Sequence, residues 1–196
     1  MNVENGGYLE LIIGPMYSGK TSELLELYKK FSFCGIKTMV INYNEDTRYS
    51  DTQLSSHDKK MIPCKQANTL NGDVQQLNDH DIDLINLSAE FIDCRVILIN
   101  EGQFFKDIVE WTKKAVEEHN KIVYICGLDG DFEREKFGQW LDLIPFCDKV
   151  TKLHSWCSSC KKKPAIFSHR LTKEKEQKVI GSDNYVPLCR ACYLHS

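Results

Sequence analysis

The sequence predicts an α/β protein, with a three-layer domain on a mainly parallel sheet followed by a small C-terminal domain organised by cysteines. Three observations lead to this prediction. Short apolar runs alternate with segments of helical periodicity, the pattern of a parallel sheet covered by helices on both faces. Basic and acidic residues divide unevenly between residues 1–150 and 151–196. Two closely spaced cysteine pairs lie in the second of these segments.

The first predicted strand is Tyr8–Ile13, an apolar run that ends at a glycine. Apolar residues then recur at helical spacing across residues 24–31, and Gly35 is the expected end of that helix. Lys37–Asn42 contains a β-branched run and is predicted to form the second strand. The polar stretch 43–60 has no clear period, so we expect a surface loop there.

The middle of the chain contains two further predicted strands with a helix between them. Residues 95–100 are almost continuously apolar, as a strand covered on both faces should be, and Glu101 follows directly. Residues 107–120 carry their apolar side chains along one helical face. Ile122–Cys126 is the second buried strand.

The charge distribution indicates two regions. Residues 1–150 carry 16 Lys/Arg and 25 Asp/Glu, a net charge of −9, whereas residues 151–196 carry 9 and 3, a net charge of +6. We therefore expect a domain boundary at residue 150. The basic segment is suited to binding nucleic acid, or to complementing anionic substrates and neighbouring subunits, and charge alone does not decide between these.

The composition is that of a globular protein, with 42% hydrophobic and 27% charged residues in a chain of 196. The first seven residues are polar and acidic, and no apolar run approaches the roughly 20 residues that span a bilayer. We expect a cytoplasmic protein with no membrane association. Five cysteines stand singly and are expected to be buried apolar fillers: Cys34, Cys64, Cys94, Cys126 and Cys147.

Residues 14–21 match the pattern G-x-x-x-x-G-K-[ST] of a phosphate-binding P-loop. Its glycines let main-chain N–H groups surround phosphates, its lysine reaches the β and γ phosphates, and its hydroxyl residue ligates Mg²⁺. The pattern is loose enough to occur by chance, but here it follows an apolar strand and precedes a helix, as it must. The predicted phosphate-binding residues are Gly14, Pro15, Met16, Tyr17, Ser18, Gly19, Lys20 and Thr21.

Asn100 and Glu101 end the second buried strand, where open α/β sheets place their ligands. A typical strand of this kind ends in an aspartate that helps to hold Mg²⁺, and a following glutamate can serve as a base. An asparagine can hydrogen-bond a metal-bound water but adds no charge. We predict that Thr21 and Asn100 hold Mg²⁺ and that Glu101 is functional; the alternative is a solvated residue at a strand end.

The four remaining cysteines form two C-x₂-C pairs separated by 28 residues. Thiolates at this spacing can converge on a tetrahedral Zn²⁺ site, and a closed site with four cysteine ligands is structural. Disulfides in an oxidising compartment are the alternative. The predicted zinc ligands are Cys157, Cys160, Cys189 and Cys192.

Taken together, the chain resembles the type II thymidine kinases of animals, bacteria and large DNA viruses, over almost its whole length. The resemblance is carried by colinear blocks, which are more specific than any single motif. These blocks are residues 14–21, Asp46-Thr47-Arg48-Tyr49 with His57-Asp58, Glu101-Gly102-Gln103-Phe104-Phe105, Gly127-Leu128-Asp129-Gly130-Asp131-Phe132 with Phe137-Gly138, the four paired cysteines, and Val179-Ile180-Gly181 leading to Tyr185.

The resemblance implies an ATP-binding P-loop kinase domain over residues 1–150. It also implies a zinc-binding domain over residues 151–196 whose long loop, the lasso, closes over the nucleoside. The implied reaction transfers the γ-phosphoryl group of ATP to the 5′-hydroxyl of thymidine, with deoxyuridine as a lesser substrate. A homotetramer and feedback inhibition by thymidine triphosphate are implied as well.

Residue roles follow from the matching motif positions. The resemblance makes Glu101 the base that accepts the proton of the 5′-hydroxyl, with Lys20 and Arg48 supplying positive charge at the transferred group. Besides the P-loop, the implied ATP-binding residues are Asp46, Arg48, Asn100 and Gln103. The implied nucleoside-binding residues are Met16, Phe104, Leu128, Phe132, Phe137, Ser168, Lys178, Val179, Ile180, Gly181, Ser182 and Tyr185.

Two alternatives belong to other functional classes. The P-loop together with the basic cysteine segment could indicate an ATP-dependent nucleic-acid-binding zinc protein, although the interleaved aromatic and basic residues of a recognised binding module are absent from the sequence. Asn100 in place of aspartate could instead indicate a kinase-like protein that binds nucleotides for regulation without efficient turnover.

Overall fold

A computed structural model describes residues 6–44, 53–55, 61–71, 88–172 and 184–196. Its centre is a six-stranded sheet in the order β5-β2-β6-β7-β1-β8, and every neighbouring pair is parallel. The strands are β1 (Tyr8–Ile13), β2 (Thr38–Tyr43), β5 (Lys65–Ala67), β6 (Val96–Ile99), β7 (Ile122–Gly127) and β8 (Lys149–Lys152). The predicted α/β fold with a parallel sheet is confirmed.

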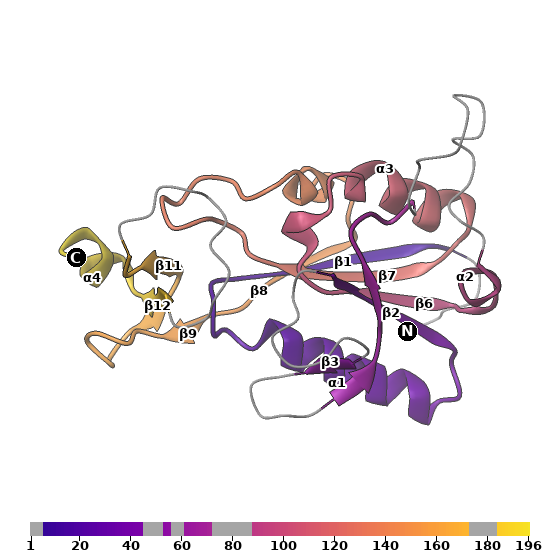
Figure 1. The fold of residues 1–196 in the computed structure, drawn as a ribbon, viewed down its shortest axis with the longest axis horizontal. Helices are drawn as coiled ribbons and strands as arrows, with labels where there is room; N and C mark the ends of the chain where they lie inside the picture. The colour runs from indigo at the N-terminus through magenta and orange to yellow at the C-terminus, as the bar shows by residue number, and fades with distance from the viewer. Residues whose placement is uncertain (1–5, 45–52, 56–60, 72–87, 173–183) are drawn as a thin grey trace.

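Helices cover both faces of this sheet, as Figure 1 shows with α1 below the sheet and α3 above it. The helix α1 (Lys20–Phe33) follows the P-loop, and α2 (Ala89–Asp93) precedes β6. The helix α3 (Ile108–Lys113) continues directly into a π-helical turn, η2 (Lys114–Glu118). Helix therefore covers most of the segment predicted at residues 107–120.

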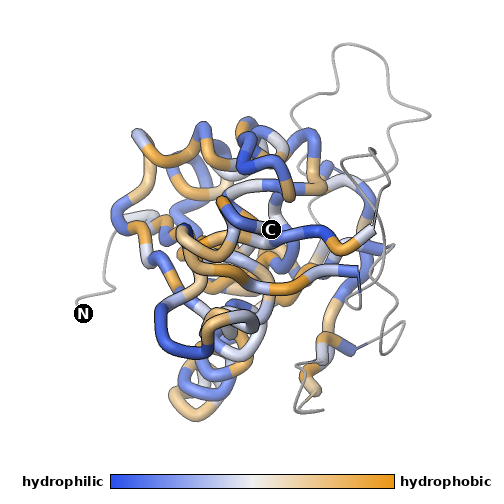
Figure 2. The backbone as a smooth tube through the Cα atoms, turned by 90° about the vertical axis from the view of Figure 1, so that its left-hand side faces the viewer, coloured by the Kyte–Doolittle hydropathy of each residue, from blue (hydrophilic) through white to orange (hydrophobic). Residues whose placement is uncertain are grey.

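The two faces of each central strand belong to different cores. Ile97 and Ile99 pack with Trp111 of α3 on one face, whereas Val96 and Leu98 pack on the other face with the core that α1 covers. Because successive side chains of a strand point to opposite faces, a strand covered on both sides must be apolar at every position. Figure 2, seen from the end that carries the C-terminus, shows hydrophobic and hydrophilic segments alternating along the backbone.

The C-terminal part of the chain packs beside one end of the sheet, at the left of Figure 1. It contains the short strands β9 (Ser155–Trp156) and β10 (Pro164–Ala165), the antiparallel pair β11 (Phe167–Arg170) and β12 (Tyr185–Leu188), and α4 (Arg190–Leu194). β8 still belongs to the large sheet, so that sheet continues two residues beyond the predicted boundary at residue 150.

Two sequence-based expectations were wrong in part. The stretch 43–60 includes the strand β3 (Gln53–Ser55), which pairs with β4 (Met61–Pro63). Leu54 of β3 is buried in the core that α1 covers. Of the five single cysteines, Cys94 and Cys126 are buried, but Cys34 at the end of α1 is exposed. Short elements η1 (Gly102–Phe104) and η3 (Trp140–Leu143) complete the described fold.

Candidate functional site

The P-loop connects the end of β1 to the start of α1. A Cβ atom at Gly14 would lie 2.6 Å from the main-chain oxygen of Leu153, so only glycine fits there. Gly19 has φ +87° with open space around its Cα, which lets a ligand approach the main chain closely. The N-terminus of the 14-residue helix α1 points at this space and favours an anion there.

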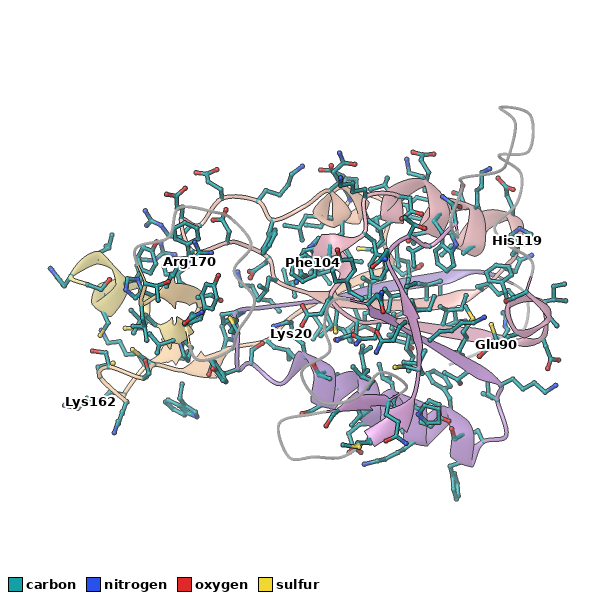
Figure 3. The ribbon with its side chains drawn as sticks, viewed as in Figure 1. Lys20, Glu90, Phe104, His119, Lys162 and Arg170 are labelled. Atoms are coloured by element: carbon teal, nitrogen blue, oxygen red, sulfur yellow. The ribbon has the colours of Figure 1, made fainter. Side chains whose placement is uncertain are left out.

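Lys20 is buried, and its Nζ donates a 2.8 Å hydrogen bond to the carbonyl of Pro15. The lysine side chain therefore folds back over the P-loop and contacts its main chain at Pro15. Figure 3 shows Lys20 and Phe104 near the same end of the sheet, facing the part of the chain that carries Arg170, whereas Glu90 and His119 lie at the opposite end. The predicted phosphate site and part of the predicted nucleoside site thus lie at one end of the sheet.

Asn100 lies at the carboxyl end of β6 in a buried polar network. Its Nδ2 donates to Asn42 Oδ1 at 2.8 Å, and its Oδ1 accepts from the Cys126 thiol at 3.0 Å. The Thr21 hydroxyl lies 3.5 Å from the same oxygen. The two predicted magnesium ligands, Thr21 and Asn100, are therefore adjacent. Each has a side-chain oxygen, the type of ligand atom that Mg²⁺ prefers.

Glu101 has a left-handed backbone, with φ 57°, and its side chain is half-buried. This conformation is uncommon for a residue that is not glycine and turns the chain sharply from β6 into η1. Gln103 Nε2 donates a 2.6 Å hydrogen bond to Glu101 Oε2. The Glu101 carboxylate is consequently held by Gln103, just after the end of β6.

Aromatic rings line the chain next to Glu101. The rings of Phe104 and Phe137 meet edge to face with centroids 5.4 Å apart, and Tyr43 lies 4.9 Å from Phe104 on the other side. The Leu128 carbonyl accepts from the Trp140 indole N–H at 3.0 Å. An apolar aromatic surface of this kind suits a nucleobase. The sequence did not predict Tyr43 as part of this surface, because nothing in the neighbouring residues marks the end of β2 as a binding position.

A second aromatic group lies where the C-terminal part contacts the loop after β7. The Arg170 guanidinium is buried and lies 3.7 Å from the Phe132 ring centroid. Arg170 Nε also donates to the Tyr185 hydroxyl at 3.1 Å, and the Tyr193 hydroxyl donates to the Phe132 carbonyl at 2.5 Å. Sequence reasoning placed Phe132 and Tyr185 in the nucleoside site but missed Arg170, which joins them.

Ser168 makes a direct link between the C-terminal part and the P-loop. Its Oγ accepts a 2.9 Å hydrogen bond from the main-chain N–H of Met16. Two residues predicted to surround the nucleoside are therefore in contact. The other predicted site residues lie outside the described part of the chain: Asp46, Arg48, Lys178, Val179, Ile180, Gly181 and Ser182.

The four paired cysteines converge, with their sulfur atoms all within 4.8 Å of one another. The Sγ atoms of Cys160 and Cys189 are 3.9 Å apart. Zn–S bonds of about 2.3 Å in a tetrahedron place sulfur atoms about 3.8 Å apart, so the cluster has the dimensions of a zinc site. The convergence of four sulfur atoms at one point suits a metal ion better than two separate disulfides.

The cysteine thiols influence one another's ionisation. Burial raises the pKa of Cys157, but main-chain donors, first that of Cys189, outweigh burial and hold the pKa at about 6. The Ser159 hydroxyl lowers the pKa of Cys192, whereas the Cys189 thiol, burial and the other thiols raise it to about 11. The crowded thiols therefore do not ionise alike, and a cation among them offsets their mutual repulsion.

Comparison with known proteins gives a consistent result. The thymidine kinase family model matches residues 7–193. The thymidine kinase of vaccinia virus, strain Western Reserve, is 39% identical over 193 residues, covering 98% of this chain and 99% of that protein. The thymidine kinase of a variola virus isolate from India is 40% identical over 193 residues, again covering 98% of this chain and 99% of that protein. Sheeppox virus thymidine kinase is 39% identical over 188 residues, covering 95% of this chain and 97% of that protein.

Within the described residues, no helix combines the length and apolarity needed to cross a membrane.

Proposed function

Because the chain belongs to the thymidine kinase family and phosphorylates thymidine with ATP, we propose that Glu101 is the base that accepts the proton of the 5′-hydroxyl. The observation that carries this proposal is the position of its carboxylate. Glu101 follows Asn100 at the end of β6, and Asn100 contacts Thr21 of the P-loop. Along the chain, Glu101 thus stands between Asn100, which contacts the P-loop, and Phe104 of the aromatic surface, where a base is needed.

The phosphate half of the site binds ATP, for which we propose the P-loop main chain and Lys20. Lys20, freed from the Pro15 carbonyl, neutralises charge that develops on the transferred phosphoryl group. Thr21 and Asn100 would hold Mg²⁺, which supplies further positive charge to the phosphates when bound. Arg48, Asp46 and Gln103 remain proposed members of this half on the strength of their motif positions.

For the nucleoside half, we propose that the base lies against Phe104, Phe137 and Leu128. The T-shaped pair of phenylalanine rings and the hydrogen-bonded Leu128–Trp140 contact support this role. We assign the lasso residues 178–182, with Met16, Ser168, Phe132 and Tyr185, to base recognition from their motif positions. Main-chain groups there would discriminate by hydrogen bonding, since a wrong base leaves them unpaired. Deoxyuridine is the proposed lesser substrate.

We further propose that the cysteine cluster holds structural Zn²⁺ and that residues 151–196 act as the zinc and nucleoside-binding domain. The convergence of the four sulfur atoms supports the metal. We also propose a cytoplasmic location, where thiols stay reduced and can bind a metal ion. A homotetramer and inhibition by thymidine triphosphate rest on the resemblance alone; light scattering and product-inhibition assays test them.

The direct test of the proposed base is Glu101→Gln, assayed for thymidine monophosphate formation with ATP and Mg²⁺. We expect kcat to fall by about 10²- to 10⁴-fold while ATP affinity changes little, because general-base catalysis contributes factors of this size. Glu110→Gln is the matched control, since Glu110 is exposed on α3. A kcat near wild type in Glu101→Gln would refute the assignment. The findings on the family do not favour the nucleic-acid-binding alternative.

A further inference from the structure

The side chain of Gln103 is buried, with 4% of its surface exposed, and both ends of its amide are engaged. Its Oε1 accepts from the main-chain N–H of Leu128 at 3.0 Å, and its Nε2 donates to Glu101 Oε2 at 2.6 Å. A peptide N–H needs an acceptor and a carboxylate needs a donor, so the two partners fix the orientation of the amide. Gln103 therefore connects the loop after β7 to the proposed base.

Two glycines from other segments make this position possible. A Cβ atom at Gly127 would lie 2.5 Å from Gln103 Oε1. A Cβ atom at Gly138, which has φ +68°, would lie 2.2 Å from the main-chain oxygen of Gln103. Both distances are far below van der Waals contact, so a larger residue at either position would displace Gln103. The glutamine is thus held on its main-chain side and at the tip of its side chain.

The group that holds the Gln103 amide is itself fixed. While the Leu128 N–H donates to Gln103, the Leu128 carbonyl accepts from the indole N–H of Trp140 at 3.0 Å. The Trp140 side chain is fully buried in the core. The anchor of Gln103 is consequently a main-chain segment that cannot shift without breaking a second hydrogen bond in the core.

We propose that Gln103 is a positioning residue for the reaction, which fixes the plane of the Glu101 carboxylate through this hydrogen bond. A half-buried glutamate has several accessible rotamers, and restricting a long polar side chain costs conformational entropy. A rigid donor supplies that restriction before substrate binds. Because a misplacement of about 1 Å can cost roughly 100-fold in rate, the held geometry matters for turnover.

This inference rests on the proposed role of Glu101 and differs from a role in binding ATP, which the motif position of Gln103 suggested. An ATP ligand would act on the KM for ATP. A residue that acts through Glu101 instead changes kcat, and its effect disappears when Glu101 can no longer act as a base. The two roles are therefore separable by measurement.

The experiment is a double-mutant cycle on the full chain, with Gln103→Met, Glu101→Gln and the double variant, and kcat and KM for ATP measured for each. Gln103→Met should lower kcat about 10- to 100-fold with KM for ATP within about twofold of wild type. In the Glu101→Gln background, Gln103→Met should change kcat by less than about twofold. The exposed Gln139→Met is the matched control and should keep wild-type kinetics.

A second variant covers the case in which Gln103→Met fails to fold. Gln103→Glu keeps an acceptor for the Leu128 N–H but places a second carboxyl group against Glu101. Two carboxyl groups at this distance share a proton, so kcat should fall at neutral pH and recover as the pH is raised. A raised KM for ATP with unchanged kcat, or equal effects of the Gln103 change in both Glu101 backgrounds, overturns the inference. Wild-type kcat in Glu101→Gln alone would instead overturn the proposed base.

Discussion

The main-chain N–H of Met16 in the P-loop donates a 2.9 Å hydrogen bond to the hydroxyl of Ser168, which lies 152 residues later on β11. Ser168 is itself buried. The loop proposed to bind the phosphate donor is therefore tied to the strand pair that carries proposed nucleoside contacts. This contact between main chain and side chain joins the two proposed substrate sites.

Ser168→Ala removes the acceptor for the Met16 N–H. We expect the KM values for ATP and thymidine to rise about fivefold each, because an ordinary hydrogen bond contributes about 1 kcal/mol. Steady-state kinetics with each substrate varied would measure the change. Ser168→Thr keeps the hydroxyl and serves as the control. Identical KM values in Ser168→Ala and wild type would show that the contact does not couple the two sites.

Asn100→Asp adds a negative charge beside Thr21. We expect the Mg²⁺ concentration for half-maximal activity to fall about fivefold, since one stronger charge interaction of about 1 kcal/mol suffices for that change. Without metal, the variant should unfold more readily, because a buried charge then lacks a partner. Activity across a Mg²⁺ titration, with a thermal melt without metal, tests both effects.

Asn42→Asp is the matched control for this change, because it places the same charge on the other member of the amide pair. It should destabilise the metal-free protein similarly but shift the Mg²⁺ requirement less. Equal shifts in both variants would mean that the position of the charge relative to Thr21 does not matter.

Glu10→Gln tests a buried carboxylate on β1. Burial alone would raise the pKa of Glu10, but hydrogen bonds from Thr151, Lys149 and Tyr8 outweigh burial and lower it below the ordinary 4.5. Because the folded-state pKa is lowered, this carboxylate stabilises the protein above pH 4.5, and the stabilisation disappears as the pH falls through the folded value.

At pH 7 we expect Glu10→Gln to lower the free energy of unfolding by about 1.5–3 kcal/mol, the usual range for a hydrogen bond to a charged group. The difference from wild type should shrink as the pH falls below 4.5. Urea denaturation at several pH values measures it, with the exposed Glu117→Gln as control. A difference that stays constant with pH would contradict this account.

Removal of metal from the cysteine cluster should affect the P-loop. Cys189 follows β12 directly, and Pro187 of β12 pairs with Ser168 of β11. We expect a strong chelator to release about one Zn²⁺ per chain, to lower the melting temperature and to raise the KM for ATP. Zinc release is read with a colorimetric indicator, independently of activity. Cys34→Ser, at an exposed thiol, should leave the zinc content unchanged. A chain that releases no zinc would refute the metal assignment.

Lys121 supports the end of α2. Its buried Nζ donates to the carbonyls of Phe91 and Cys94, both at 2.6 Å, and to that of Ile92 at 3.3 Å. Lys121→Met leaves these acceptors without the lysine donor and should lower the free energy of unfolding by about 2–4 kcal/mol. Lys106→Met, at an exposed lysine, is the control for urea denaturation. Equal stability of the two variants would contradict the role of Lys121.

Much of the fold could be predicted because its signals are local. The strand at Val96–Ile99 has an apolar residue on each face at every step, and only a covered parallel strand requires that pattern. The strand β3 was not predicted because only one apolar residue, Leu54, distinguishes its sequence from that of a loop. The π-helical turn after α3 has no sequence signature that we could use.

The candidate site was predictable only where a motif marks it. The spacing of residues in the P-loop and in the cysteine pairs indicates their chemistry. In the structure the P-loop precedes α1 and the four cysteine sulfur atoms lie together. Arg170 and Tyr43 carry no such mark, since their partners come from distant segments. The same is true of the hydrogen bond between Gln103 and Glu101, which depends on the left-handed backbone of Glu101.

The position of β1 in the sheet has a consequence for biosynthesis. Within the described sheet, its two neighbours are β7 and β8, so Tyr8 pairs with Ile122 and Glu10 with Lys149. At about 5–20 residues per second, translation takes roughly 5 to 25 seconds to reach the first of these partners after β1 has been made. During that time β1, the strand that leads into the P-loop, is an apolar segment without its partner strands. The nucleotide site is therefore completed late in synthesis, and the nascent chain depends on protection from aggregation until β7 has emerged.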